Sequence, residues 1–176
     1  MDVAERSRAR VQERLARLEQ EFGSTAVDQT TFSVGEGAYR HAVEHSREGR
    51  VDVHAFVHNE SGDVLLSEDD GSWTIPQGQT EDAERPAHAA KRVVSEAAGV
   101  ECTIRDAVRA TICGVRNDED DDAETVYRLS VVFDAEIDSD ALDEDDTDTE
   151  TTGATAASDA AIRWDESAGA AVAEFV

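Results

Sequence analysis

Positive charge, aromatic side chains and cysteine are all scarce in this chain. Acidic residues number 41 against 16 basic ones, of which only Lys91 is a lysine, and the net charge at pH 7 is -25. Such a charge repels nucleic-acid phosphates and anionic membrane surfaces, which excludes general nucleic-acid binding. The two cysteines, Cys102 and Cys113, are not spaced as a CxxC pair. We therefore expect free thiols in a reducing, cytoplasmic compartment.

Long hydrophobic runs are missing as well. No apolar run approaches the roughly 18 residues that a membrane-spanning helix needs. The residues after Met1 are charged, so they do not form the apolar core of a secretory signal. The sequence therefore predicts a cytoplasmic protein that makes no membrane contact.

High charge combined with only 5% aromatic residues has two explanations. One is intrinsic disorder, which this composition favours. The other is a folded protein adapted to molar salt, where the Debye length falls to about 3 Å and repulsion between like charges is screened. Periodic apolar segments run along most of the chain and favour the second explanation. The composition resembles that of acidic cytoplasmic proteins from extreme halophiles.

Two helices are predicted before residue 50, so we interpret 1–49 as an N-terminal helical extension. The first covers 2–22 and ends at Gly23, and the second covers about 35–48. The first helix either packs on the rest of the chain or pairs with a second copy in a homodimer, and packing is favoured because Arg8 interrupts the heptad pattern. Its apolar stripe consists of Ala4, Val11, Leu15, Leu18 and Phe22.

Histidines occur twice as spaced pairs. His41 and His45 lie four residues apart on the second helix, a spacing that suits a metal, but no cysteine or third histidine lies nearby in the sequence. We interpret them as surface residues. His54 and His58 share one face of a predicted strand, and we interpret them as ordinary residues of that face.

From residue 50 onward the apolar period changes from helical to alternating. We predict a hairpin at 51–69, strands at 101–116, 125–137 and 160–164, a helix within 76–99, and a final helix from Glu166. Residues 138–159 are low in complexity and are predicted to form a mobile loop. This order of elements predicts a mixed α/β (α+β) fold, with a mixed β-sheet sandwiched between helices.

The segment 76–99 combines a glycine-containing loop with a helix. Gly78 follows a short strand, where glycine lets the backbone approach a ligand closely. Pro86 suits the first turn of the helix and Gly99 its C-terminal end. One face of this helix is apolar, while positions 93, 96 and 97 lie on another face that we expect to look into a reactive cleft. The apolar face consists of Ala87, Ala90, Val94 and Ala98.

This segment resembles the Nudix box, in which Gly is followed after five residues by Glu and after seven more by R-E-U-x-E-E-x-G-U, where U is aliphatic. The match runs without a gap over the 23 residues from Gly78 to Val100. The resemblance implies a Nudix fold over 50–176. The matching positions are Gly78, Glu84, Arg92, Val94, Glu96, Gly99 and Val100.

Two positions depart from the box. Val93 and Ala97 stand where the family has glutamates that commonly bind Mg²⁺ or Mn²⁺. A divalent cation neutralises the charge of a diphosphate and helps to generate the attacking nucleophile. Valine and alanine offer no ligand, so the metal site implied by the resemblance is damaged.

The resemblance assigns roles to the remaining residues. Glu96 and Arg92 are the candidate catalytic residues, and the metal ligands would be Glu96, the Gly78 carbonyl and Glu81. Substrate contacts fall to Gln77, Gly78 and Arg116, with Arg128 a weaker candidate. Glu84, paired with Arg92, and Gly99 would be structural. Other acids that could replace the lost ligands are Asp82, Asp118–Asp122 and Glu124.

Two functions follow from the resemblance. The first is a hydrolase that cleaves the pyrophosphate bond of a nucleoside diphosphate linked to another moiety, dependent on Mg²⁺ or Mn²⁺. The alternative is a degenerate Nudix domain that binds a nucleotide or a protein partner without turnover. The hydrolase predicts a nucleotide-like small molecule as the partner, and the degenerate domain predicts either such a molecule or a protein.

Overall fold

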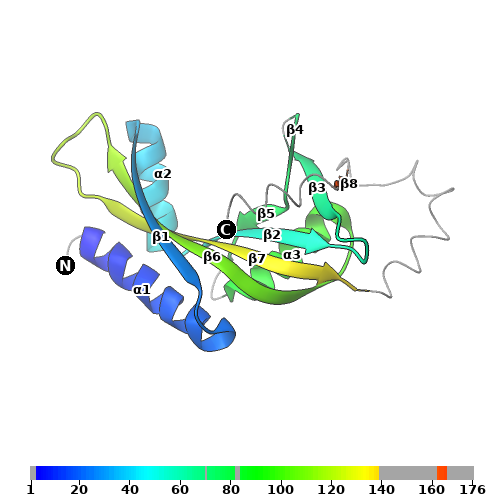
Figure 1. The fold of residues 1–176 in the computed structure, drawn as a ribbon. Helices are drawn as coiled ribbons and strands as arrows, with labels where there is room; N and C mark the ends of the chain where they lie inside the picture. Colours follow the sequence, from blue (N-terminus) through cyan, green and yellow to red (C-terminus); the bar gives the residue numbers. More distant parts are fainter. Residues whose placement is uncertain (1–2, 70, 82–83, 139–161, 166–176) are drawn as a thin grey trace. The chain divides into compact units, whose positions relative to one another are not determined.

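A computed structural model gives the fold of the chain and describes residues 3–69, 71–81, 84–138 and 162–165 (Figure 1). Helices and strands alternate irregularly along the sequence, which is typical of the predicted α+β class. The elements are α1 (Val3–Phe22), β1 (Ala26–Val34), α2 (Glu36–Arg47), β2 (Asp52–His58), β3 (Val64–Asp69), β4 (Ser72–Thr74), β5 (Gln77–Gln79), α3 (Pro86–Ala98), β6 (Cys102–Asn117), β7 (Val126–Ile137) and β8 (Ile162–Asp165).

The strands form a mixed sheet. Hydrogen-bonded neighbours follow the order β1-β6-β7-β2-β3-β4, with β5 paired to β2 and β8 paired to β3. β1 runs parallel to β6, from Ala26 opposite Arg109 to Val34 opposite Asn117, whereas β2 and β3 are antiparallel. This combination of a mixed sheet with helices confirms the predicted fold class, and the hairpin predicted at 51–69 is present as β2 and β3.

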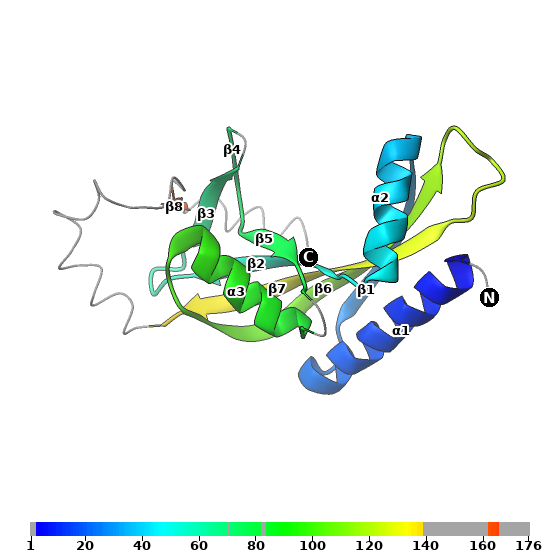
Figure 2. The same cartoon turned by 180° about the vertical axis from the view of Figure 1, so that it is seen from behind.

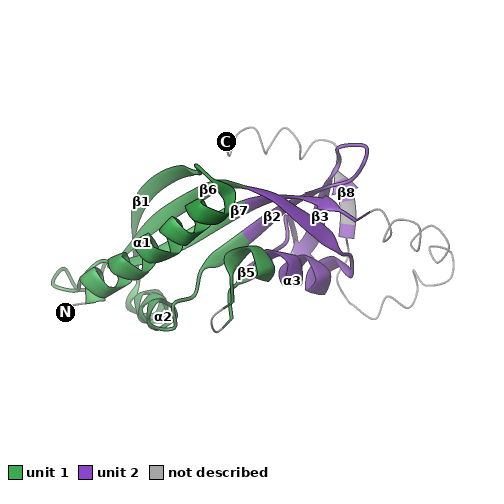
Figure 3. Ribbon diagram, turned by 90° about the horizontal axis from the view of Figure 1, so that it is seen from below, with its two compact units in different colours: residues 1–53, 79–89, 107–132 green, residues 54–78, 90–106, 133–176 purple. Residues whose placement is uncertain are grey.

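The chain divides into two compact units, coloured separately in Figure 3. The first contains residues 1–53, 79–89 and 107–132. In this unit α1 buries Val11 and Leu18, and the Ser7 hydroxyl accepts a hydrogen bond from the Tyr127 N–H at 3.0 Å. The Arg10 guanidinium donates to the Ser46 carbonyl at 2.6 Å. The helix thus packs on its own unit, in agreement with the favoured prediction, and homodimer formation through it stays a prediction.

Strand β1 was not predicted from the sequence. It lies beside β6 in two opposite views (Figures 1 and 2). Eight of its nine residues are exposed, including Phe32 and Val27. Because β1 is held by backbone pairing with β6 rather than by burying one face, its residues carry no alternation of polar and apolar side chains.

The second unit contains residues 54–78, 90–106 and 133–176. Its β3 is the central strand, because it pairs with β4 and β8 and meets β2 at Val64 opposite His58. Val57 on β2 and Val64 and Leu65 on β3 are fully buried. Because Val64 and Leu65 are consecutive and point to opposite faces of the strand, both faces of β3 are covered there. β8 confirms the strand predicted at 160–164.

Two predicted elements lie outside the described residues: the mobile loop at 138–159, apart from Asp138, and the helix from Glu166. Among the described residues, no helix is both long and apolar enough to cross a membrane.

Candidate functional site

Helix α3 has the ends that its sequence predicts. It begins at Pro86 and ends at Ala98, and Gly99 follows with a φ of 68°. This is the left-handed conformation in which glycine commonly ends a helix. Ala90 and Val94 are buried as predicted, and so are Ala89 and Val93. Ala87 and Ala98, the other two residues of the predicted stripe, are only half-buried. The buried face is therefore shifted from the predicted stripe and includes a position that we expected in a cleft.

Val93 packs directly on Gly78 in the second unit. A Cβ built on Gly78 would lie 2.7 Å from Cγ2 of Val93, closer than two carbon atoms can approach without displacement. The Val93 side chain is only 6% exposed. The glycine of the box is thus needed for close approach of a valine side chain, at the position where the family has a metal-binding glutamate.

Positions 93, 96 and 97 do not share one environment. Val93 is buried, Ala97 is half-buried and Glu96 is exposed. The expectation that the three together face a cleft is therefore wrong for Val93. The physical reason is that removing the two methyl groups of Val93 from water is favourable, whereas removing a carboxylate from water is unfavourable.

Glu96 forms an ion pair within α3. Its Oε2 lies 3.2 Å from Nη1 of Arg92, one helical turn earlier, with side chains that are 65% and 23% exposed. An exposed pair at this spacing contributes little to stability. The two candidate catalytic residues are thus adjacent, and the Glu96 carboxylate keeps most of its contact with solvent.

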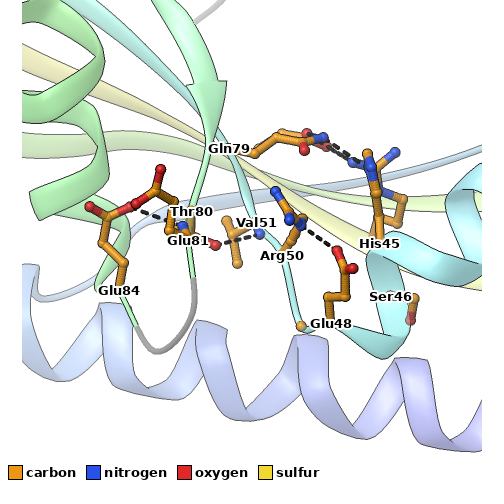
Figure 4. Close-up of polar contacts among 12 residues, drawn as sticks. His45, Ser46, Glu48, Arg50, Val51, Gln79, Thr80, Glu81 and Glu84 are labelled. Atoms are coloured by element: carbon orange, nitrogen blue, oxygen red, sulfur yellow. Dashed lines mark hydrogen bonds and ion pairs between the residues drawn. The ribbon is translucent and has the colours of Figure 1, made fainter. Parts of the chain in front are cut away.

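Glu84 organises the loop before α3 in the first unit. Its Oε1 accepts a hydrogen bond from the Glu81 N–H at 3.0 Å, and its own N–H donates to the Glu81 carbonyl at 3.0 Å (Figure 4). Oε2 lies 3.3 Å from Nδ1 of His88. These contacts place Glu81 on the same turn as Glu84, with an exposed side chain. The predicted Glu84–Arg92 pair stays a prediction.

A polar cluster in the first unit was not predicted from the sequence. Both terminal oxygens of Asp52 accept hydrogen bonds from Nη2 of Arg128 at 2.8 Å. Nε2 of Gln79 donates to Asp52 Oδ1 at 2.9 Å and lies 3.1 Å from Nδ1 of His45, a contact drawn in Figure 4. Four elements contribute, so no local spacing in the sequence signals the cluster. Arg128, a weaker candidate for substrate contact, is held by this ion pair.

Burial and neighbouring charges act on the protonation of His45 in this cluster. Burial lowers the pKa of His45, and the positive charges of Arg128, His41 and Arg50 act in the same direction, against the opposing effect of Asp52. The His41 and His45 rings lie 4.1 Å apart. In a neutral His45 with an unprotonated Nδ1, this nitrogen accepts a hydrogen bond from Gln79 Nε2, and the ring adds no charge beside the Asp52–Arg128 pair.

The remaining candidates for substrate contact occupy different environments. Gln77 is exposed on β5 and Arg116 is exposed near the end of β6, whereas Gly78 is half-buried. Gln77 and Gly78 belong to the second unit and Arg116 to the first.

Two of the acids at 118–124 accept hydrogen bonds from backbone N–H groups. Oδ1 of Asp120 accepts the N–H of Asp122 at 3.0 Å, and Oε2 of Glu124 accepts the N–H of Val3 at 2.8 Å. Both contacts lie in the first unit. They anchor the loop and the start of α1, so a simpler role than metal binding accounts for these two acids.

A divalent cation does not fit the described residues. Mg²⁺ requires near-octahedral oxygen ligands, and Val93 and Ala97 supply none. Within the described ranges, no group of three or more His, Cys, Asp or Glu side chains is placed to hold a metal ion. The Mg²⁺ or Mn²⁺ implied by the resemblance therefore lacks a sufficient set of ligands among the described residues.

Comparison with known proteins identifies the scaffold. The family model described as NUDIX domain matches residues 49–172. Solved structures with local similarity include a NUDIX hydrolase from Nitrosomonas europaea, 22% identical with a TM-score of 0.36, covering 50% of this chain and 47% of that one. Another is a MutT protein from Methanosarcina mazei Go1, 23% identical with a TM-score of 0.35, covering 48% and 60%.

A third solved structure, a Nudix hydrolase from M. Smegmatis, is 17% identical with a TM-score of 0.41 and covers 65% of this chain and 68% of that one. The part of this chain that matches the Nitrosomonas europaea protein spans about half of the length of that protein. No curated protein sequence matches the chain. Because the family model covers most of its length, the chain belongs to the NUDIX domain family.

Proposed function

We propose that this NUDIX domain binds a nucleotide-like, phosphate-containing molecule without cleaving its pyrophosphate bond. The observation that carries the proposal is the packing of Val93 on Gly78, where a Cβ on the glycine would lie 2.7 Å from the valine Cγ2. The space at this position is filled by methyl groups, and a neighbouring helix turn offers Ala97 instead of a carboxylate.

Charge is the physical basis of this proposal. In the hydrolysis of a diphosphate, an oxygen attacks a phosphorus atom that carries negatively charged oxygens, while a second anion departs. Protein groups or cations must neutralise the charge that develops. Of the three family carboxylate positions in α3, only Glu96 carries a carboxylate that could bind a cation. This side chain is exposed and paired with Arg92. Binding a phosphate requires fewer charged groups than cleaving it does. A domain that cannot hydrolyse the bond can therefore still bind the ligand.

Hydrolysis is the second candidate function. It is favoured by membership of the family and by the exposed carboxylate of Glu96, which is 65% accessible to solvent. The reaction would be cleavage of a pyrophosphate bond in a nucleoside diphosphate linked to another moiety, dependent on Mg²⁺ or Mn²⁺. This candidate requires further cation ligands beyond the groups that the described residues provide.

A panel of ligands separates the two candidates. ADP-ribose, dinucleoside polyphosphates and nucleoside triphosphates are incubated with Mg²⁺ or Mn²⁺ at high KCl. The nucleotide products of pyrophosphate-bond cleavage are separated by chromatography, and ligand binding is measured in parallel by calorimetry. We expect saturable binding of at least one ligand without release of product. Turnover that disappears in Glu96→Gln would establish hydrolysis instead.

Two further outcomes would count against the proposal. Turnover unaffected by Glu96→Gln would place the chemistry on other residues. Absence of both binding and turnover across the panel would remove the nucleotide as ligand and leave a protein partner as the remaining form of the degenerate function. A matched Gln77→Ala variant tests whether bound nucleotide contacts the exposed end of β5.

A further inference from the structure

A cavity of about 550 Å³ lies between the C-terminal half of α1 and the start of α3, within the first unit. Three of its lining residues are arginines: Arg14 and Arg17 on α1, and Arg85 immediately before α3. Gln20 also lines it, and Glu21 is the acidic residue among the described lining residues. Residues 14–21 precede the segment matched by the family model, which begins at 49.

The charge of this cavity is opposite to that of the chain. Acidic residues outnumber basic ones 41 to 16 over the whole sequence, whereas the described lining residues include three arginines and one glutamate. A random patch of this surface would be acidic. The local excess of guanidinium groups therefore marks a place where an anion is attracted despite the net charge of -25.

Arg14 is fixed in position by the backbone. Its Nη1 donates to the Glu84 carbonyl at 3.2 Å and its Nη2 to the Gly49 carbonyl at 3.1 Å. Both acceptors are neutral, so these contacts orient the guanidinium without cancelling its charge. A guanidinium held in one place loses little further entropy when a ligand binds.

Arg17 and Arg85 are available to a ligand. Arg17 pairs with Glu13 at 2.7 Å, but the two side chains are 70% and 62% exposed, and water weakens such a pair by screening both charges. The Arg85 side chain is exposed, and no partner for its guanidinium is found in the part of the chain that the structure describes. A competing anion can therefore engage both groups.

We propose that this cavity is a binding site for a small phosphate-bearing molecule. Its volume falls within the roughly 300–1,000 Å³ of small-molecule sites. The planar guanidinium presents paired donors that match phosphate oxygens, and the start of α3 adds a favourable partial positive charge. The site goes beyond the proposed function, because it rests on α1 and on Arg85 and needs neither Val93 nor Glu96.

Calorimetric titration with inorganic pyrophosphate tests the site, in the lowest KCl concentration that keeps the chain folded. The test variant is Arg17→Gln with Arg85→Gln. The matched control is Arg40→Gln with Arg105→Gln, which removes the same two charges from exposed ion pairs with Glu36 and Glu136. Unfolding midpoints verify that each variant is folded.

We expect pyrophosphate to bind the unchanged chain saturably, at least tenfold more weakly to the test variant, and within twofold of the original affinity to the control. Equal weakening in both variants would mean that bulk charge, and not this cavity, attracts the anion. The absence of saturable binding would also overturn the site. Either result leaves the proposed function untouched, because that function is judged by nucleotide binding and product release.

Chemical modification supplies a second readout, and ADP distinguishes a nucleotide from a free phosphate as the ligand. Phenylglyoxal labelling followed by mass spectrometry should show Arg85 protected by pyrophosphate and Arg40 unprotected. Tighter binding of ADP than of pyrophosphate, lost in the test variant, would identify a nucleotide. Equal labelling of Arg85 with and without pyrophosphate would contradict the proposal.

Discussion

Gly78 and Val93 are in such close contact that a Cβ on the glycine would lie 2.7 Å from Cγ2 of the valine. The contact joins Gly78, in the loop of the box, to Val93 in helix α3, at the position where the resemblance implies a metal-binding glutamate. The contact between the two residues is apolar. The scaffold of the box is preserved because the packing between loop and helix does not depend on a cation.

Substitution of Gly78 by Ala should destabilise the chain by about 1–3 kcal/mol, the usual cost of overpacking. Val93→Ala alone should cost about 2 kcal/mol through the lost methyl groups. In the double variant the new methyl group occupies vacated space, so we expect it to be more stable than the sum of the two effects by about 1 kcal/mol. Denaturant unfolding measures all four proteins. Additive effects would show that the two residues do not share this space.

Replacing Val93 and Ala97 together by Glu should rebuild a cation site at the cost of stability. Without metal we expect unfolding at lower denaturant than in the matched Val93→Gln, Ala97→Gln variant, because a buried carboxylate loses hydration. Mn²⁺ at about 100 times its dissociation constant should return roughly 2.7 kcal/mol to the Glu variant. An equal response of the Gln variant would reveal only general screening of the acidic surface.

Arg128→Met should destabilise the chain by about 1–3 kcal/mol, because Asp52 would keep its charge and lose the partner at 2.8 Å. The side chains of this pair are 17% and 29% exposed, which places the expected cost below that of a fully buried pair. The control is Arg105→Met, whose pair with Glu136 has both side chains 56% exposed. The control should change the free energy of unfolding by less than about 0.5 kcal/mol. Equal effects of the two substitutions would mean that the Asp52 cluster is not a stabilising one.

His45 should make the folded state less stable as pH falls. Burial is the main cause of its lowered pKa, with Arg128 acting in the same direction, so the unfolded chain binds more protons than the folded one below the ordinary value of 6.5. The free energy of unfolding therefore rises with pH through this window. In His45→Gln the loss on going from pH 7.5 to 5.5 should be smaller than in the unchanged chain. His88→Gln, at an exposed site, serves as control, and identical pH profiles would refute the assignment.

Cys102 should be inert to thiol reagents while the chain is folded. Burial raises the pKa of its thiol to about 11, and its side chain is almost inaccessible, so little thiolate exists at pH 8. In a Cys113→Ala background, we expect alkylation at least a hundredfold slower than in denaturant. The rate should follow the free energy of unfolding across denaturant concentrations. Fast labelling under native conditions would show local opening at the start of β6.

Local chemistry allowed α3 and the β2–β3 hairpin to be predicted from the sequence. Pro86 and Gly99 act on the backbone of their own segment, and the alternation in residues 51–58 expresses burial on one strand. The family box is a local pattern too, so its remaining residues and its two departures can be recognised in the sequence alone. Strand β1 could not be predicted, because it is defined by pairing with β6, some 80 residues away in the sequence.

The sequence by itself thus determined the family, the ends of the box helix and the loss of two carboxylates at positions 93 and 97. The tertiary structure alone decided that Val93 is packed on Gly78, that Asp52 is paired with Arg128, and that Arg14, Arg17 and Arg85 line one cavity. The reason is physical: helix caps and strand alternation arise between near neighbours in the chain. Packing contacts and charge clusters depend on distances between segments that only folding brings together.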